Sequence, residues 1–224
     1  MKKGRASPEK LGRGPALGGR SPAPSPESVS KVVFLDIDGV LQPDNARIRV
    51  TEEKKRLKDF YKSLYKSFQV DYSVYSQMDV MTVYHLWDKE SVANLLHILN
   101  SSGAYIVLSS SWRIFPMGKM RDLFKIHGLD KYYVDNTMRE DFRLIEQLRA
   151  DEEGYKSFYV DRVIEILEYL KNHPNIENYV AIDDMNLIPG LENHFIRASQ
   201  SLTRTQAEEA VEILNRENDP IPSE

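Results

Sequence analysis

Two aspartates two residues apart, Asp36 and Asp38, directly follow the apolar run 32–35. Side chains i and i+2 of an extended chain point the same way, so both carboxylates could face one cleft. Carboxylates this close repel each other unless a cation lies between them, and Mg²⁺ held by carboxylates and a substrate phosphate is the usual arrangement. One carboxylate could then attack a phosphoryl group while the other moves protons. The alternative is a solvated turn, because Asp-x-Asp-Gly also suits turn chemistry.

Three apolar runs have the composition of buried β-strands: 32–35, 104–108 and 179–182. A short edge strand is expected at 195–196. Helical periodicity marks the segments 51–68, 88–100, 118–127, 161–170 and 204–216. Strands that alternate with helices predict a parallel sheet covered on both faces. We therefore expect an α/β fold, a three-layer Rossmann-like sheet flanked by helices, with a small helical cap insert after the first strand.

Polar residues end each of the three main strands. The first is followed by the two aspartates, the second by Ser109 and Ser110, and the third by Asp183 and Asp184. Parallel strands end at one shared edge, which is where open α/β sheets bind ligands. Carboxylates can hold a metal there, and a hydroxyl with backbone N–H groups at a helix start can hold phosphate. The pattern predicts a combined metal and phosphate site.

Composition excludes several classes of protein. The chain has 224 residues, a net charge of −4 and no cysteine, so disulfides and thiolate metal sites are impossible. No apolar stretch approaches the roughly 20 residues that span a bilayer. The N-terminus lacks the apolar core of a secretory signal. We expect a cytoplasmic protein with no membrane association, and the sequence leaves the oligomeric state open.

The chain divides into a tail, a domain and a short end. Residues 1–30 are rich in Gly, Pro and Ser, with six basic residues against two acidic ones, and predict a disordered basic tail. An electrostatic tether or a targeting extension is the alternative. The folded domain is expected at 31–217, with the cap insert at about 45–87, and a flexible C-terminus at 218–224. Without the tail the body is more acidic still, which disfavours general nucleic-acid binding.

The three motifs together resemble the haloacid dehalogenase (HAD) superfamily of phosphohydrolases over 31 to about 215. Its Asp-x-Asp-Gly motif matches 36–39, its Ser or Thr after a strand matches 108–110, and its acidic pair matches 183–184. The resemblance implies a HAD-like phosphatase domain that uses Mg²⁺. A binding module that merely keeps this fold would need none of the three motifs.

The resemblance also implies roles for the acidic residues. Asp36 would be the nucleophile that forms an aspartyl-phosphate. Asp38 would protonate the leaving oxygen and then activate water. Mg²⁺ would be held by the Asp36 carboxylate, the Asp38 backbone carbonyl and Asp183, with Asp184 binding through water or orienting the other ligands.

The phosphate-binding groups are less closely specified. Either Ser109 or Ser110 would bind the transferring phosphate, and strand alternation sends the two to opposite faces. The superfamily's third motif is a cation, usually Lys, and its match here is loose. Arg162 at a helix start and Lys156 upstream are both candidates. For each, a solvent-exposed helix cation is an equally good interpretation.

A finer resemblance involves the run 109–113, Ser-Ser-Ser-Trp-Arg, and a late His194. These resemble a subgroup of phosphatase-like domains associated with RNA-repair proteins. Trp112 and Arg113 could contact the leaving group; the alternative is a core tryptophan and an arginine paired with a surface acid. For His194 a structural role is more common than a catalytic one.

The function expected is a Mg²⁺-dependent phosphomonoester hydrolase acting through an aspartyl-phosphate. Its substrate would be a nucleotide, a nucleic-acid end or a small phosphorylated metabolite. The alternatives are a catalytically weak HAD-fold binding or regulatory module, or a protein phosphatase. Several tyrosines of the insert could stack on a base, although some must form the buried side of its helix. They are Tyr61, Tyr65, Tyr72, Tyr75 and Tyr84.

Overall fold

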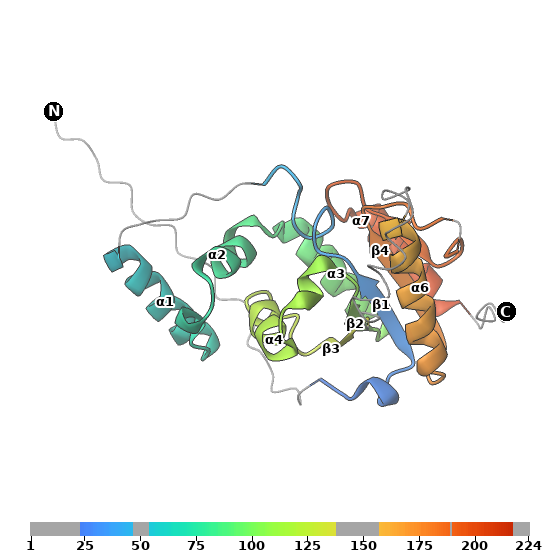
Figure 1. Cartoon of the computed structure of the whole chain (residues 1–224), viewed down its shortest axis with the longest axis horizontal. Helices are drawn as coiled ribbons and strands as arrows, with labels where there is room; N and C mark the ends of the chain where they lie inside the picture. Colours follow the sequence, from blue (N-terminus) through green and yellow to red (C-terminus); the bar gives the residue numbers. More distant parts are fainter. Residues whose placement is uncertain (1–22, 47–53, 138–156, 189, 217–224) are drawn as a thin grey trace.

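The computed structural model of the chain describes residues 23–46, 54–137, 157–188 and 190–216. Its parallel strands form a five-stranded sheet in the order β3-β2-β1-β4-β5 (Figure 1). Their bounds are Lys31–Leu35 (β1), Tyr105–Leu108 (β2), Tyr133–Asn136 (β3), Asn178–Asp183 (β4) and Phe195–Arg197 (β5). The expected α/β class is confirmed, and the three main apolar runs form the three central strands.

Helices connect the strands. The α-helices in the described ranges are α1 (Lys54–Phe68), α2 (Gln77–Leu86), α3 (Lys89–Ser102), α4 (Met117–Lys125), α6 (Ser157–Asn172) and α7 (Arg204–Asn215). Single 3₁₀ turns form η1 (Pro26–Ser28), η2 (Tyr72–Val74) and η3 (Ser111–Ile114). Thr203 and Gln206 form a capping box at the start of α7.

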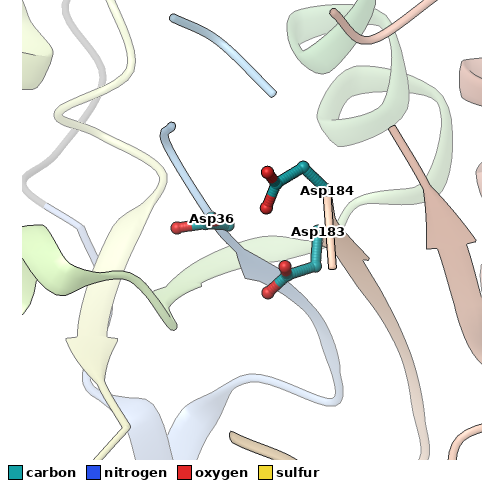
Figure 2. A group of neighbouring side chains, drawn as sticks. All are labelled: Asp36, Asp183 and Asp184. Carbon is teal, nitrogen blue, oxygen red and sulfur yellow. The ribbon is translucent and has the colours of Figure 1, made fainter. Parts of the chain in front are cut away.

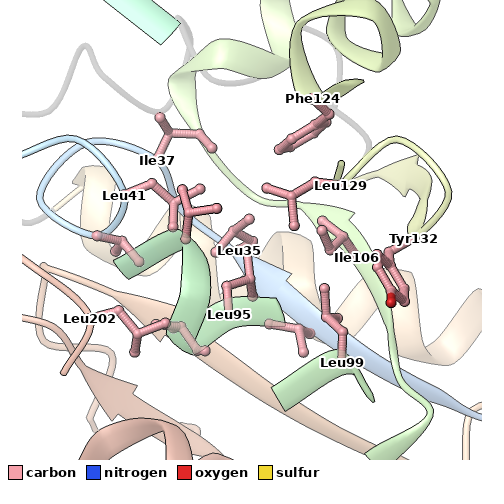
Figure 3. Close-up of a cluster of buried hydrophobic side chains, with 14 of the residues drawn as sticks. Leu35, Ile37, Leu41, Leu95, Leu99, Ile106, Phe124, Leu129, Tyr132 and Leu202 are labelled. Atoms are coloured by element: carbon pink, nitrogen blue, oxygen red, sulfur yellow. The ribbon is translucent and has the colours of Figure 1, made fainter. Parts of the chain in front are cut away.

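The sheet is covered on both faces, which makes three layers. On one face α6 packs through residues such as Tyr169, whose ring meets Phe34 of β1 edge to face at 5.6 Å. On the other face α3, α4 and α7 bury a larger cluster (Figure 3). There Leu35 of β1 and Ile106 of β2 pack with Leu99 of α3. Burial of each such side chain contributes about 1.5–3 kcal/mol.

Two segments differ from the expectation. No strand was expected at 133–136, but β3 pairs there with β2 at the sheet edge. Only two of its residues are apolar, which is too few for a recognisable strand pattern. The segment 69–87 lies outside the helices expected from the sequence, yet it contains η2 and α2. Apolar residues 80, 81 and 83 of α2 are all buried, so this helix shows no simple amphipathic stripe.

The described chain begins before β1. Residues 23–30 include η1, and Val29 is buried against the α6 side of the core. The Asn175 side chain donates to the carbonyls of Pro26 and Val29 at 2.9 and 2.8 Å. The rest of the expected tail, the expected helix start at Thr51 and residues 217–224 lie outside the described residues. None of the described helices is both long and apolar enough to cross a membrane.

Candidate active site

Three candidate residues lie in one row at the carboxyl edge of the sheet. The register aligns the last residues of β1 and β2 with Ile182 of β4. Ser109 N donates to the carbonyl of Leu35 at 2.8 Å, and Asp36 N donates to the carbonyl of Ile182 at 3.0 Å. Ser109, Asp36 and Asp183 therefore follow one another, in that order, at the ends of the neighbouring strands β2, β1 and β4. The edge expected from the sequence is present.

The acidic residues gather where β1 and β4 end (Figure 2). One carboxylate oxygen from each of Asp36, Asp183 and Asp184 lies within 4.8 Å of the others. Asp36 and Asp183 are only 5% and 2% exposed. Buried carboxylates this close need positive charge, and an all-oxygen donor set suits a hard divalent cation such as Mg²⁺. The residues present thus fit the metal that the sequence predicted.

Gly39 makes room for this cluster. Its φ is +71°, in the left-handed region that favours glycine. A Cβ placed on Gly39 would lie 2.5 Å from the Cβ of Asp184. The loop after β1 can therefore pass over Asp184 only because a glycine stands there.

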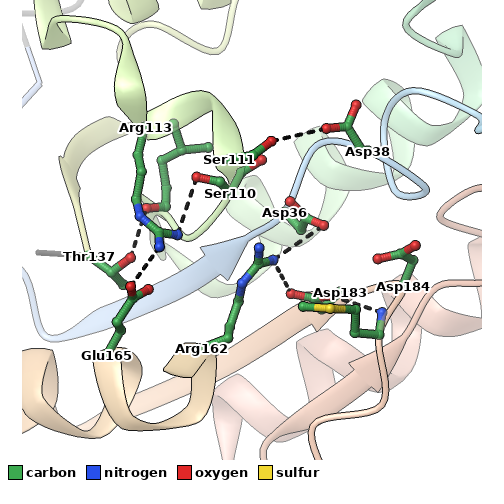
Figure 4. A network of polar contacts seen from close by, with 12 residues as sticks. Asp36, Asp38, Ser110, Ser111, Arg113, Thr137, Arg162, Glu165, Asp183 and Asp184 are labelled. Atoms are coloured by element: carbon green, nitrogen blue, oxygen red, sulfur yellow. Dashed lines mark hydrogen bonds and ion pairs between the residues drawn. The ribbon is translucent and has the colours of Figure 1, made fainter. Parts of the chain in front are cut away.

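Arg162 supplies positive charge at the same place. Its Nη1 lies 2.5 Å from Asp183 Oδ2 and 3.3 Å from Asp36 Oδ2 (Figure 4). The side chain extends from α6 and is largely buried, so the alternative of a solvent-exposed helix cation does not describe it. The other candidate, Lys156, lies outside the described residues.

One arginine does not fully offset three carboxylates. Burial raises the pKa of Asp183, and Asp36 raises it further, although Arg162 opposes both effects. Burial, followed by the charge of Asp36, also raises the pKa of Asp184. Asp183 and Asp184 thus gain protons more readily than free aspartates. A divalent cation would reverse that tendency by favouring the ionised forms.

Asp38 has a separate set of partners. Its Oδ2 accepts hydrogen bonds from Trp112 Nε1 at 3.2 Å and from Ser111 Oγ at 3.3 Å, and its Oδ1 accepts one from Gln42 Nε2 at 3.2 Å. Burial and the nearby charge of Asp36 raise the pKa of Asp38. A carboxyl group that holds its proton more strongly than usual is suited to general acid work.

The two candidate serines differ in what they contact. Ser110 Oγ caps η3 by accepting from Trp112 N at 3.4 Å. Ser109 Oγ is buried and has no hydrogen-bond partner among the described residues. Buried hydroxyls are nearly always paired, so an unpartnered one at a sheet edge suggests that a ligand completes it.

Arg113 has a buried acidic partner rather than a surface one. Its Nη2 lies 2.6 Å from Oε1 of Glu165, and its Nη1 donates to the carbonyl of Ser110 at 3.2 Å (Figure 4). Sequence reasoning missed Glu165. The signal was an acid three residues after Arg162, a spacing that puts both side chains on one face of a helix.

The remaining candidates have packing roles. The Trp112 ring meets Trp87 and Phe115 at centroid distances of 6.0 and 5.9 Å. His194 stacks on Tyr179 at 4.3 Å, and its Nδ1 hydrogen-bonds the carbonyl of Tyr179 at 3.0 Å. These contacts agree with the structural role expected of His194. They also support the core alternative for the Trp112 ring, while its Nε1 reaches Asp38.

Comparison with known proteins gives one match. A family model described as the HAD domain in Swiss Army Knife RNA repair proteins matches residues 32–208. No curated protein and no solved structure matches the chain. The matched range covers most of the chain and contains all three sequence motifs, the cap insert and Arg162. The chain therefore belongs to the family of HAD domains found in Swiss Army Knife RNA repair proteins.

Proposed function

We propose that the protein is a Mg²⁺-dependent phosphomonoester hydrolase that works through an aspartyl-phosphate on Asp36. Family membership indicates a phosphohydrolase-type function. The observation that carries the finer proposal is the row of Asp36, Ser109 and Asp183 with Arg162 against its two carboxylates. A nucleophile, a phosphate-binding hydroxyl and a cation then surround one position.

In the proposed reaction, a carboxylate oxygen of Asp36 attacks the phosphorus, and the bond from phosphorus to the leaving oxygen breaks. Asp38 gives its proton to that oxygen, so the alcohol departs neutral. Asp38 then takes a proton from a water molecule that attacks the phosphorus of the aspartyl-phosphate. The acyl–phosphate bond breaks, and Asp36 and inorganic phosphate are released.

Several residues would hold the phosphate and the metal. Ser109 is preferred over Ser110 as the phosphate ligand because its hydroxyl has no protein partner in the described ranges. Arg162 would take the position of the third-motif cation and bind the phosphoryl oxygens as charge develops on them. Bound Mg²⁺ would neutralise charge on the attacking and leaving oxygens.

For the metal itself, Asp36, Asp183 and Asp184 supply the carboxylates, and the family resemblance adds the backbone carbonyl of Asp38. Among the substrates expected, the family description favours a phosphorylated nucleic-acid end over a nucleotide or a metabolite.

The test is hydrolysis of p-nitrophenyl phosphate and of a phosphorylated oligonucleotide by the purified protein with Mg²⁺. Asp36→Asn keeps the shape of the side chain but removes the nucleophile, so we expect no measurable turnover. Glu209→Gln, an exposed carboxylate change on α7, is the matched control and should retain full activity. If the wild type proved as inactive as Asp36→Asn on a broad phosphate panel, the proposal would fail in favour of a binding or regulatory module.

A further inference from the structure

Helix α1 of the cap insert has one face made of alternating cationic and aromatic side chains. Lys58, Tyr61, Lys62 and Tyr65 are spaced i, i+3, i+4 and i+7, which places them along one side of a helix. Together with Leu57, Asp71 and Ser73 they line a hollow of about 590 Å³, in which the two lysines outnumber the one acid. Tyr65 is 54% exposed, although it is a large aromatic residue. We call these four residues the α1 face.

A different side of α1 attaches the helix to the protein. Leu64 is buried, and Phe60 meets Tyr84 edge to face at 5.2 Å. Phe68 meets Tyr72 in the same way at 6.2 Å. These contacts hold the helix in place, and the half-buried Tyr61 also packs against the core from the α1 face. The exposed ring of Tyr65 has no such packing role.

The charge of α1 is opposite to that of the chain. The helix carries six basic residues and one acidic residue, whereas the chain as a whole has a net charge of −4. In the described part of the chain, neither Lys58 nor Lys62 forms an ion pair with an acidic residue. Positive charge concentrated on one helix of an acidic protein points to a polyanionic partner.

We propose that the α1 face binds single-stranded nucleic acid, with Tyr61 and Tyr65 stacking on bases and Lys58 and Lys62 contacting phosphates. Proteins bind single-stranded nucleic acid through aromatic rings interleaved with cations, because unpaired bases offer their faces to aromatic side chains. A duplex hides those faces. A membrane or an acidic protein would use the lysines but would give the exposed tyrosine rings no such role.

In our proposal the α1 face serves the proposed reaction from within the insert. The helix follows the Asp36–Asp38 loop in sequence, within the insert between β1 and β2, and lies beside α2 at one end of the molecule (Figure 1). A strand bound there would be the body of a substrate whose phosphorylated end enters the active site. In that respect the inference rests on the proposed function.

The test measures binding without turnover. Fluorescence anisotropy of the full chain would be recorded with unphosphorylated oligouridylate and oligothymidylate of about 12 nucleotides, a length within the usual site size of single-strand binders. We expect Tyr65→Leu to weaken binding by about 5- to 100-fold through lost stacking. Tyr65→Phe keeps a ring and should bind like the wild type. Lys62→Glu should weaken binding and lower the salt slope by roughly one or more.

Arg204→Glu on α7 is the charge-matched control, because it changes an exposed cation outside α1 by the same amount as Lys62→Glu. It should bind like the wild type. The inference is overturned if the wild type does not bind single strands, if Tyr65→Leu binds as tightly as Tyr65→Phe, or if a duplex of equal length binds as tightly as the single strand. Melting curves of the variants confirm that they are folded.

Failure of this inference differs from failure of the proposed function. Asp36→Asn should bind the unphosphorylated strands like the wild type while losing hydrolysis. A wild type that binds strands through α1 but hydrolyses no phosphate would contradict only the proposed function. A wild type that hydrolyses phosphates but does not bind single strands would contradict only the inference.

Discussion

The indole Nε1 of Trp112 donates a hydrogen bond to Oδ2 of Asp38 at 3.2 Å. This bond joins η3, which begins just after Ser109 and Ser110, to the loop that follows β1. The Trp112 ring is held in turn by Trp87 and Phe115, so packing in the core fixes the direction of the donor. Asp38 is thereby oriented by the same turn that follows the proposed phosphate-binding residue.

Trp112→Phe tests this orientation. It keeps an aromatic ring against Trp87 but removes the donor to Asp38. A hydrogen bond to a charged group contributes about 1.5–3 kcal/mol, so we expect kcat to fall about tenfold or more, with a smaller change in KM. Steady-state kinetics with an alkyl phosphate, whose leaving group needs a proton, gives the measurement. Wild-type kcat in this variant would show that Gln42 and Ser111 suffice to hold Asp38.

Arg162 should affect catalysis and metal binding in opposite directions. Arg162→Gln removes the charge that offsets Asp36 and Asp183, so we expect turnover to fall by about 10²–10³-fold. The same change should tighten Mg²⁺ binding, because less positive charge then repels the cation. Kinetics and isothermal titration of Mg²⁺ measure the two effects. Arg162→Lys, which restores the charge, should recover part of the turnover, and weaker Mg²⁺ binding by Arg162→Gln would contradict this account.

The buried pair of Arg113 and Glu165 is expected to matter for stability. Glu165→Gln removes the acid that neutralises a buried guanidinium, which should lower the free energy of unfolding by about 3–5 kcal/mol in urea titrations. Glu208→Gln breaks the exposed pair with Arg204 and should cost under about 1 kcal/mol. Adding Arg113→Met to Glu165→Gln should restore part of the loss. Equal effects in the buried and exposed pairs would argue against this difference.

Alanine substitutions at Gly39 and Gly103 distinguish the cost of backbone strain from the cost of steric crowding. Both have positive φ, +71° and +73°, but only Gly39 has a neighbour that a Cβ would strike. Gly103→Ala should cost only about 1–2 kcal/mol for the left-handed conformation. Gly39→Ala should cost more and also displace Asp184, so Mg²⁺ should no longer raise its melting temperature. Equal destabilisation of the two variants, with Mg²⁺ stabilisation retained in both, would show that Asp184 tolerates the extra carbon.

His127 should make the protein sensitive to acid. Its Nε2 lies 2.7 Å from the carbonyl of Val83, its ring stacks on Trp87 at 5.3 Å, and burial lowers its pKa. Below about pH 6.5 the unfolded chain binds a proton that the folded protein resists, so its contribution to stability falls as the pH falls. Urea unfolding at pH 7.5 and 5.5, without metal, measures the change.

His127→Gln provides the comparison for that measurement. It removes the titrating ring, so its free energy of unfolding should fall less between the two pH values than that of the wild type. The other titratable groups contribute equally to both proteins, so their contributions cancel when the two changes in unfolding free energy are compared. An identical pH dependence in the two proteins would exclude His127 as the acid-sensitive group.

Part of the fold was predictable from local patterns. The strands β1, β2 and β4 are short runs of buried apolar residues that end in polar ones, and their short length and β-branched or aromatic residues distinguish them from buried helices. β3 was not predictable, because its second half, Asp135 and Asn136, is polar and its pairing with β2 makes it a strand. The helix α2 was obscured for a related reason, since it is buried on more than one side.

The sequence by itself determined which residue types stand at the ends of the central strands: Asp36, the pair Ser109 and Ser110, and the pair Asp183 and Asp184. Their meeting at one place was predictable, because a parallel sheet brings the carboxyl ends of its strands to one edge. The order and register of the strands were decided by the tertiary structure. Only the tertiary structure decided the partners of these residues. It left Ser109 rather than Ser110 with an unpartnered hydroxyl among the described residues, turned Asp38 toward Trp112, and brought Arg162 from α6 onto two carboxylates. These contacts join segments far apart in the chain, and spacing within one segment carries no information about which distant side chain will meet it.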